Sequence, residues 1–366
     1  MARGADLFRT EPPAWAEGAS FLLLNPRLPE AQKRMVLAAD FPEATGRVWV
    51  ATSGTGGLLK MVALSRSALE ASARAVNAHL GSGPDDIWIN PLPLFHVGGL
   101  GIVVRAALSG ARWKPCEAWN AEAFVRQAIE TKATLASLVP TQVHDLAQAS
   151  CTAPPSLRAV VVGGGAIDQA LLDSVRSRGW KLLPSYGLTE AASQVATAEP
   201  EATDFDWLPL LPHIEARVGG DAVLELRGES LLDGWMVFSA DGQPNWENPK
   251  HDGWYRTGDR AELRGCRVRI LGRADDLVKI RGELVDVAAL ERALRARVPS
   301  GQIAILAAPD ERAGHELIVV ADSAETAARV CSMIDETFPP YARPREVMVG
   351  VVAKTALGKT VRGRGT

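Results

Sequence analysis

The segment from Arg158 to Leu183 constrains the fold more than any other part of this sequence. Residues 158–162 are apolar after the first and are typical of a strand buried on both faces. Three glycines follow, Asp168 can cap a helix that runs to about Arg178, and residues 180–183 resemble a second strand. A strand, a helix and a strand in this order predict a parallel sheet with a right-handed crossover.

Ligands of such sheets bind in loops beyond the carboxyl ends of the strands. We expect three loops to lie there, namely Thr52–Lys60, Gly163–Gly165 and Ser185–Glu190. The first loop follows a predicted strand at residues 47–51 and combines three glycines, two threonines, a serine and a lysine. Its glycines let backbone N–H groups approach an anion, and Lys60 adds a positive charge. The loop lacks the order GxxxxGKS or GxxxxGKT of a Walker A sequence, and a purely structural turn is the alternative.

The remaining motifs are weak when each is taken alone. Tyr186 could stack on a flat base, and Thr189 and Glu190 offer the hard oxygen ligands that magnesium prefers, although any strand–loop junction could contain the same residues. Asp259 follows a glycine turn and could bind a ribose diol or simply end a hairpin. His96 lies in an apolar run, where a histidine is more often a core residue than a catalyst.

Composition excludes several other classes of protein. The chain has 366 residues, 47% hydrophobic and 23% charged, with a formal net charge of −3, which fits two or three globular domains and disfavours a nucleic-acid or anionic-lipid partner. Its four cysteines are scattered, so neither a zinc site nor a disulfide framework is indicated. No apolar run approaches the roughly 20 residues of a membrane span, and the first ten residues lack a signal-peptide core. We therefore expect a cytoplasmic protein. The segment from Lys354 to Arg364 is locally basic, and a solvated tail is one interpretation of it.

The predicted order of helices and strands changes near residues 271–276. A helix is predicted at 287–297, strands at 303–307 and 317–321, and a second helix at 324–338. This is a compact α+β pattern of about ninety residues, large enough for a small domain. We therefore expect one domain at residues 1–273 and another at 274–366, with Asp275 near the joint.

Together these segments resemble the adenylate-forming acyl-CoA synthetases, which are AMP-binding enzymes. The motifs occur in the order of that family between Thr52 and Lys359. The family's phosphate loop usually reads TSGTTGxPK, whereas here Gly56 replaces a threonine and Leu59 replaces the proline. The resemblance implies an α/β fold, with a large N-terminal domain of parallel-rich sheets and helices and a small, hinged C-terminal α+β domain.

The resemblance also implies roles for particular residues. The residues expected to bind the nucleotide or coenzyme are Thr52, Ser53, Gly54, Thr55, Lys60, Gly163, Gly164, Tyr186, Gly187, Asp259, Arg273 and Lys279. Glu190 is expected to bind Mg²⁺ next to the catalytic Thr189, and Lys359 to serve the adenylation step. Asp275 matches the hinge, and His96 matches a gate beside the acyl pocket.

Two stretches are most similar to the 2-succinylbenzoate–CoA ligases of menaquinone biosynthesis. Residues 185–197 resemble the signature SYGMTETASQ, and residues 93–100 resemble PLFHxxGL. The resemblance implies that ATP activates a carboxylic acid as an acyl-adenylate and that coenzyme A then takes the acyl group. Because 2-succinylbenzoate keeps a second carboxylate, its pocket needs a cation or several donors, for which His96, Arg105 and Ser193 are candidates.

Family members have many more residues before the phosphate loop than the 51 present here. Part of the usual N-terminal subdomain is therefore expected to be missing or replaced. A wall of the acyl pocket would then be reduced or supplied by a second subunit, which leaves a homodimer open. One alternative is another aryl- or acyl-CoA ligase. A second is a shortened, non-catalytic protein that binds a nucleotide or a partner; the presence of Glu190, Asp259 and Lys359 argues against it.

Overall fold

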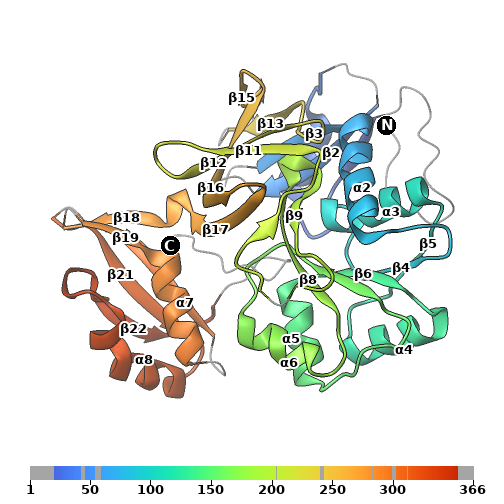
Figure 1. The fold of residues 1–366 in the computed structure, drawn as a ribbon. Helices are drawn as coiled ribbons and strands as arrows, with labels where there is room; N and C mark the ends of the chain where they lie inside the picture. Colours follow the sequence, from blue (N-terminus) through green and yellow to red (C-terminus); the bar gives the residue numbers. More distant parts are fainter. Residues whose placement is uncertain are drawn as a thin grey trace. The chain divides into compact units, whose positions relative to one another are not determined.

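A computed structural model describes residues 20–42, 46–53, 59–202, 204–239, 243–281, 283–298, 302–310 and 312–352. The chain divides into two compact units (Figure 1). Unit 1 comprises residues 1–219, 225–257 and 263–269, and unit 2 comprises residues 220–224, 258–262 and 270–366. Both units contain helices and strands, which confirms the predicted α/β class.

A six-stranded sheet in unit 1 contains the predicted strand–helix–strand segment. In spatial order its strands are β5 (Arg112–Pro115), β4 (Ile87–Asn90), β6 (Leu135–Leu138), β7 (Ala159–Val162), β8 (Leu182–Leu188) and β9 (Ser193–Thr197). All neighbours are parallel except β8 and β9. The helices between these strands are α3 (Val97–Ser109), α4 (Ala121–Thr131), α5 (Pro140–Gln148) and α6 (Gln169–Arg176). As predicted, Asp168 caps α6, since its Oδ1 accepts from the Ala170 backbone N–H at 2.7 Å.

Helix α2 (Arg66–Leu80) precedes the strands of this sheet in the sequence. Its capping residue is Ser65, whose Oγ accepts from the Ala68 N–H at 3.1 Å. Gly81 ends the helix with a left-handed backbone at φ 58°.

A second sheet of unit 1 contains the start of the glycine loop. Its strands, in spatial order, are β1 (Phe21–Leu23), β2 (Arg47–Ser53), β3 (Leu59–Ser65), β13 (Gly234–Phe238) and β14 (Pro244–Glu247). Helix α1 (Glu30–Ala38) lies between β1 and β2 in the sequence. The loop Thr52–Lys60 therefore connects two antiparallel strands of this sheet, and the prediction that it ends a strand of the parallel sheet is wrong.

A third sheet is antiparallel where its pairing is described. Its strands, in spatial order, are β10 (Leu208–Pro209), β17 (Arg267–Arg273), β16 (Trp254–Arg264), β12 (Val223–Gly228) and β11 (Ile214–Val218), with β15 (Lys250–His251) beside β16. The rest of unit 2 comprises β18 (Leu277–Ile280), β19 (Glu283–Asp286), α7 (Val287–Arg297), β20 (Ile303–Asp310), β21 (Gly314–Ala321), α8 (Ala324–Thr337) and β22 (Glu346–Val349). Both predicted helices and both predicted strands of this region are confirmed within a few residues.

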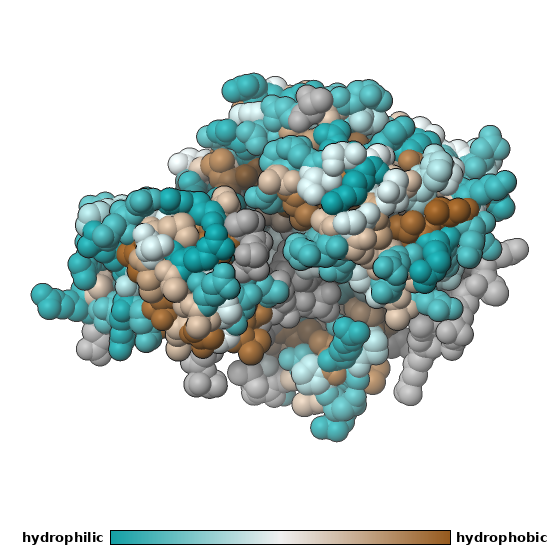
Figure 2. Space-filling model, turned by 90° about the horizontal axis from the view of Figure 1, so that it is seen from below, coloured by the Kyte–Doolittle hydropathy of each residue, from teal (hydrophilic) through white to brown (hydrophobic). Residues whose placement is uncertain are grey.

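Each unit has its own apolar core. In unit 1, Phe124 and Trp180 stack with ring centroids 6.3 Å apart among side chains from the parallel sheet. In unit 2, Leu294 of α7 and Val330 of α8 pack on Ile305 of β20. On the face drawn in Figure 2, hydrophobic residues are interspersed with hydrophilic residues. No helix in the described ranges is long and apolar enough to cross a membrane.

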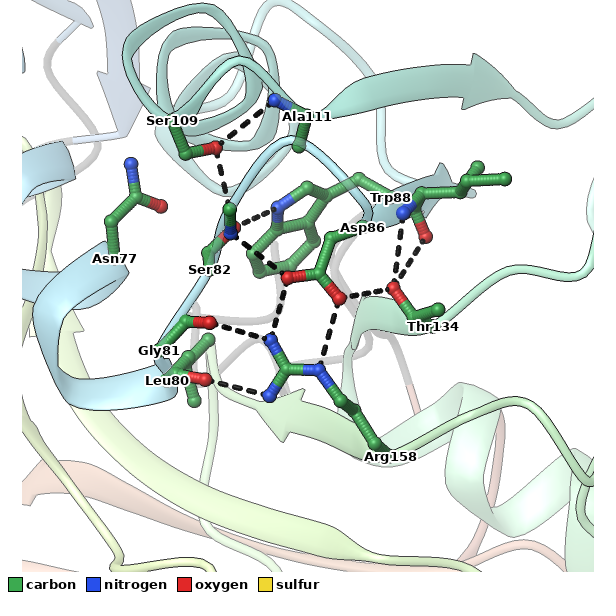
Figure 3. A network of polar contacts seen from close by, with 12 residues as sticks. Asn77, Leu80, Gly81, Ser82, Asp86, Trp88, Ser109, Ala111, Thr134 and Arg158 are labelled. Atoms are coloured by element: carbon green, nitrogen blue, oxygen red, sulfur yellow. Dashed lines mark hydrogen bonds and ion pairs between the residues drawn. The ribbon is translucent and has the colours of Figure 1, made fainter.

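A polar network joins α2 to the parallel sheet (Figure 3). The Arg158 guanidinium donates to both carboxylate oxygens of Asp86, at 2.9 and 2.7 Å, and to the Leu80 carbonyl at 2.6 Å. Thr134 Oγ1 donates to Asp86 Oδ1 at 2.6 Å. Because Asp86 is only 7% exposed, these donors compensate a carboxylate that has lost most of its hydration.

Removing this guanidinium should destabilise the protein markedly. Arg158→Ala leaves the Asp86 carboxylate without its main partner, which costs about 3 kcal/mol of unfolding free energy. The matched control is Arg126→Ala, because Arg126 lies 4.0 Å from Glu122 in an exposed pair worth about 0.5 kcal/mol. Urea unfolding at neutral pH measures both variants, and equal small losses would contradict the assigned role of Arg158.

The contribution of this network to the stability of the protein should depend on pH. Burial raises the pKa of Asp86, but the hydrogen bonds from Arg158, Thr134 and the Gly83 N–H outweigh it, so the pKa lies below its usual value. A carboxyl with a lowered folded-state pKa contributes full stability above its unfolded pKa of about 3.9 and loses it as pH falls through the folded value. The stability difference between the parent and Arg158→Ala should therefore shrink below about pH 4. A difference that stays constant in urea unfolding from pH 6 to pH 2.5 would contradict this.

Candidate active site

The β2–β3 hairpin positions the predicted phosphate-binding residues. Thr52 at the end of β2 lies opposite Lys60 in β3. The backbone of Ser53 ends β2, while Gly54 and Thr55 lie outside the described residues. Lys60 Nζ lies 3.9 Å from the centroid of the Trp235 ring. Among the residues that the structure describes, Lys60 forms no ion pair with a carboxylate, so its charge is available to an anion.

The turn that contains Thr189 and Glu190 is held beside this hairpin. These residues form the 3₁₀ turn η2 (Thr189–Ala191) after β8. The Leu232 N–H donates to the Glu190 carbonyl at 2.8 Å, and the next residue, Asp233, donates to the Ala63 carbonyl of β3 at 2.9 Å. Two successive backbone donors therefore connect η2 to β3, which brings together two motifs that are far apart in the sequence.

Gly187 fits its position because a side chain there would collide with the backbone. Tyr186 and Gly187 belong to β8, which corrects the predicted loop at Ser185–Glu190, and the pairing with β9 shifts register between them. A Cβ on Gly187 would lie 2.0 Å from the Ser193 carbonyl oxygen. The chain continues as a strand through this motif because β9 turns back to pair with it.

The glycine turn after β7 lies at the carboxyl end of a parallel strand, as predicted. A Cβ on Gly163 would lie 2.8 Å from Ser185 Oγ on the neighbouring strand β8. Gly164 has φ +84°, a left-handed conformation that favours glycine. This turn and the Tyr186 segment of β8 therefore begin at one edge of the sheet, where ligands of parallel sheets bind.

Arg105 is the most buried charged group near these strands. It lies in α3, is 1% exposed, and donates from Nη2 to Ser193 Oγ at 3.0 Å. The Gln194 amide oxygen must face the guanidinium, which has only donors, and it then accepts from Nη2 at 3.0 Å and Nη1 at 3.2 Å. The Trp88 ring lies 5.7 Å from the guanidinium carbon. The structure thus brings together the predicted pair Arg105 and Ser193 and adds Gln194.

The partners of Arg105 are all neutral. No carboxylate lies within ion-pair distance of it in the described ranges, and its Nε is buried without a hydrogen-bond partner. Burial lowers the pKa of Arg105 to about 10, so the side chain remains protonated at neutral pH. A buried cation with neutral partners is costly, and an anionic ligand would compensate it.

The sequence analysis does not assign Gln194 to the pocket, because adjacent residues of a regular strand face opposite sides. Here Ala192 and Ser193 have φ 53° and 127°, so the alternation is broken and both Ser193 and Gln194 reach Arg105. The adjacency of the two polar residues in a buried strand was the available signal.

His96 immediately precedes α3, the helix that contains Arg105. Its Nε2 is buried with no partner among the described residues, and burial lowers its pKa, so the imidazole is neutral at pH 7. No hydrogen bond or ring contact among the described residues joins His96 to Arg105 or Ser193, although all three are predicted pocket residues.

Unit 2 contains the remaining predicted site residues. Arg273 Nη1 lies 3.4 Å from Asp259 Oδ1, so the two residues predicted to hold a ribose are neighbours. Asp275 belongs to the turn η3 (Ala274–Asp276) and Lys279 to β18, and their side chains are not described. Lys359 lies outside the described residues.

The described residues include no group of three His, Cys, Asp or Glu side chains that could hold a metal ion alone. Mg²⁺ does not need such a group, because it commonly uses one or two carboxylates, waters and substrate phosphates. The Glu190 carboxylate and the Thr189 hydroxyl occur on one turn and are hard oxygen donors. This donor set fits a magnesium ion that arrives with a nucleotide.

The fold and these segments define a family. Residues 42–234 match the family model described as AMP-binding enzyme, and the chain belongs to that family. It is 34% identical over 285 residues to the 2-succinylbenzoate–CoA ligase of Salmonella typhimurium, covering 76% of this chain and 58% of the relative. It is 31% identical over 299 residues to the Escherichia coli enzyme of that name, covering 80% and 62%. The chain thus spans about three fifths of the length of these curated relatives.

Solved structures show the same architecture. A variant of Escherichia coli MenE with bound OSB-AMS matches with a TM-score of 0.77 and 25% identity, covering 94% of this chain and 86% of that chain. Bacillus subtilis MenE in complex with ATP and magnesium ion matches with a TM-score of 0.75 and 21% identity, covering 94% and 78%. These matches confirm the predicted fold class.

Proposed function

We propose that this protein uses ATP to activate 2-succinylbenzoate as an acyl-adenylate and then transfers the acyl group to coenzyme A, as a step of menaquinone biosynthesis. The observation that carries the proposal is the buried Arg105 guanidinium, which has only neutral partners in the described ranges. The names of the relatives support the same substrate. The proposed enzyme class is an AMP-forming acid–thiol ligase.

The reaction brings like charges together, and this requirement gives the residues their roles. A carboxylate oxygen attacks the α-phosphorus of ATP, and pyrophosphate leaves. The thiol of coenzyme A then attacks the acyl carbon, and AMP leaves with that oxygen. Lys60 and Lys359 would offset the repulsion between the two anions. Glu190 and Thr189 would hold Mg²⁺, which when bound neutralises phosphate charge.

Arg105 distinguishes between acyl substrates in this proposal. An acid with a single carboxylate uses that group to attack ATP, so no second anion remains to contact the Arg105 guanidinium. The second carboxylate of 2-succinylbenzoate can accept from the Arg105 donors that Ser193 and Gln194 now occupy. Another aryl- or acyl-CoA ligase remains the first alternative, and a nucleotide-binding protein without catalysis is the second.

Pyrophosphate release against a panel of acids, with and without coenzyme A, tests the proposal. We expect release with 2-succinylbenzoate and little with benzoate or a fatty acid, together with a thioester when coenzyme A is present. Release with benzoate or a fatty acid alone would instead identify another ligase. ATP binding without release from any acid would support the non-catalytic alternative.

The hinge at Asp275 is also a proposal and can be tested separately. Proline fixes φ near −65° and disfavours a helical conformation at Ala274, which the turn η3 contains. Asp275→Pro should therefore restrict any rotation about this turn. We expect adenylate formation within about threefold of the parent and thioester formation reduced about a hundredfold. Equal loss of both steps, measured as pyrophosphate and thioester, would contradict the hinge.

A further inference from the structure

The ammonium group of Lys60 rests on an aromatic ring instead of an acidic partner. Its Nζ lies 3.9 Å from the centroid of the Trp235 ring, within the range of a cation–π contact. In the register of β3 and β13, Lys60 lies opposite Val237 and Val62 lies opposite Trp235. Lys60 and Trp235 are thus diagonal neighbours on one face of the sheet, a distance that long side chains can bridge.

The Trp235 ring is itself fixed by two neighbours. Its Nε1 donates to Glu247 Oε2 at 3.0 Å across the β13–β14 pair. Tyr255 packs against it edge-on, with centroids 6.0 Å apart and an interplanar angle of 85°. A ring held in this way offers a constant surface to the lysine side chain, which would otherwise sample many rotamers.

We propose that Trp235 is a positioning residue for Lys60, whose ammonium it holds in one place until the phosphates of ATP bind it. This inference rests on the proposed function. An indole face suits the task because its attraction is weaker than that of a carboxylate, so the triphosphate can displace it. Ordering Lys60 beforehand lowers the entropic cost of nucleotide binding, an advantage that affects affinity more than turnover.

The contact itself can be observed by NMR after reductive ¹³C-methylation of the lysines, which keeps their charge. A methyl group above an indole is shifted upfield by the ring current, so one signal should lie upfield of the other lysine methyl signals. Lys60→Arg should remove this signal and assign it. Addition of Mg²⁺–ATP should move it downfield by ending the contact. Absence of an upfield signal, or one that saturating ATP leaves unchanged, would overturn the inference.

Steady-state kinetics then test whether the contact between Lys60 and Trp235 affects the KM for ATP. Trp235→Leu should raise the KM for ATP about fivefold to tenfold and leave kcat within about twofold, while Trp235→Phe, which keeps a ring, should recover most of the loss. The matched control is Trp254→Leu, because Trp254 has arginines above its ring, Arg217 at 4.2 Å and Arg227 at 4.7 Å, but not Lys60.

The outcomes separate this inference from the proposed function. Circular dichroism and urea unfolding first establish that each variant is folded. An unchanged KM in Trp235→Leu, or a loss in Trp235→Phe as large as in Trp235→Leu, overturns the role of Trp235 while ATP chemistry in the parent stands. A parent that releases no pyrophosphate with any acid overturns the proposed function, and the ATP-induced methyl shift still decides whether nucleotide displaces Lys60 from the ring.

Discussion

Arg105→Met is expected to lower kcat/KM for 2-succinylbenzoate by about a hundredfold or more, because it removes the only cation placed at Ser193 and Gln194 among the described residues. Truncating one partner of a buried, hydrogen-bonded charge pair typically costs 2–5 kcal/mol, which is about thirtyfold to several thousandfold. Methionine fills a similar apolar volume, so the effect should fall on substrate recognition. Pyrophosphate release at subsaturating acid measures it.

Two comparisons make this prediction specific. Arg105→Lys keeps the charge but loses the paired guanidinium donors, so we expect it to retain more activity than Arg105→Met. An analogue of the acid without its second carboxylate should react with parent and Arg105→Met at similar low rates. Arg112→Met on the exposed strand β5 serves as the surface control. If Arg105→Met discriminated between the two acids as well as the parent does, Arg105 would not bind the second carboxylate.

Lys359→Ala should reduce adenylate formation by a thousandfold or more and leave ATP binding within a few-fold of the parent. The proposed function assigns this lysine to the charge that would develop during attack on the α-phosphate. Removing a single preorganised hydrogen-bond donor to such a charge lowers kcat by about a hundredfold to a thousandfold, and here a full positive charge is lost as well. Acid-dependent pyrophosphate release and equilibrium dialysis of ATP measure the two effects.

The control for this prediction is Lys354→Ala, which removes a charge from the same segment. It should release pyrophosphate nearly as fast as the parent. Normal release by Lys359→Ala would contradict the adenylation role, and parallel losses in both variants would indicate that the basic segment acts through its general charge.

Local features of the fold could be predicted from the sequence because each depends on neighbouring residues. The apolar run ending at Val162, the cap at Asp168 and the helix Val287–Arg297 all appear as expected. A helix is indicated by apolar residues at helical spacing and by a capping residue, and a buried strand by a run of apolar residues. Each of these signals lies within about ten residues of sequence.

Non-local pairing could not be predicted in the same way. The sequence predicts that the glycine loop follows a strand of the parallel sheet, yet β3 pairs with β13, a strand far along the chain. Arg105 and Ser193 are 88 positions apart, and Lys60 meets Trp235 only through that same strand pairing. Periodicity indicates which side chains are buried but not which partners they contact, so these contacts follow only from the fold.

The fate of one carboxylate oxygen tests most directly whether the protein forms an acyl-adenylate. Carboxyl-¹⁸O-labelled 2-succinylbenzoate, ATP and coenzyme A are incubated with the protein, and the nucleotide product is analysed by mass spectrometry. If the acid attacks the α-phosphorus, AMP must retain one labelled oxygen when the thiol displaces it. We predict AMP with one ¹⁸O. Unlabelled AMP, or ADP in its place, would contradict an acyl-adenylate.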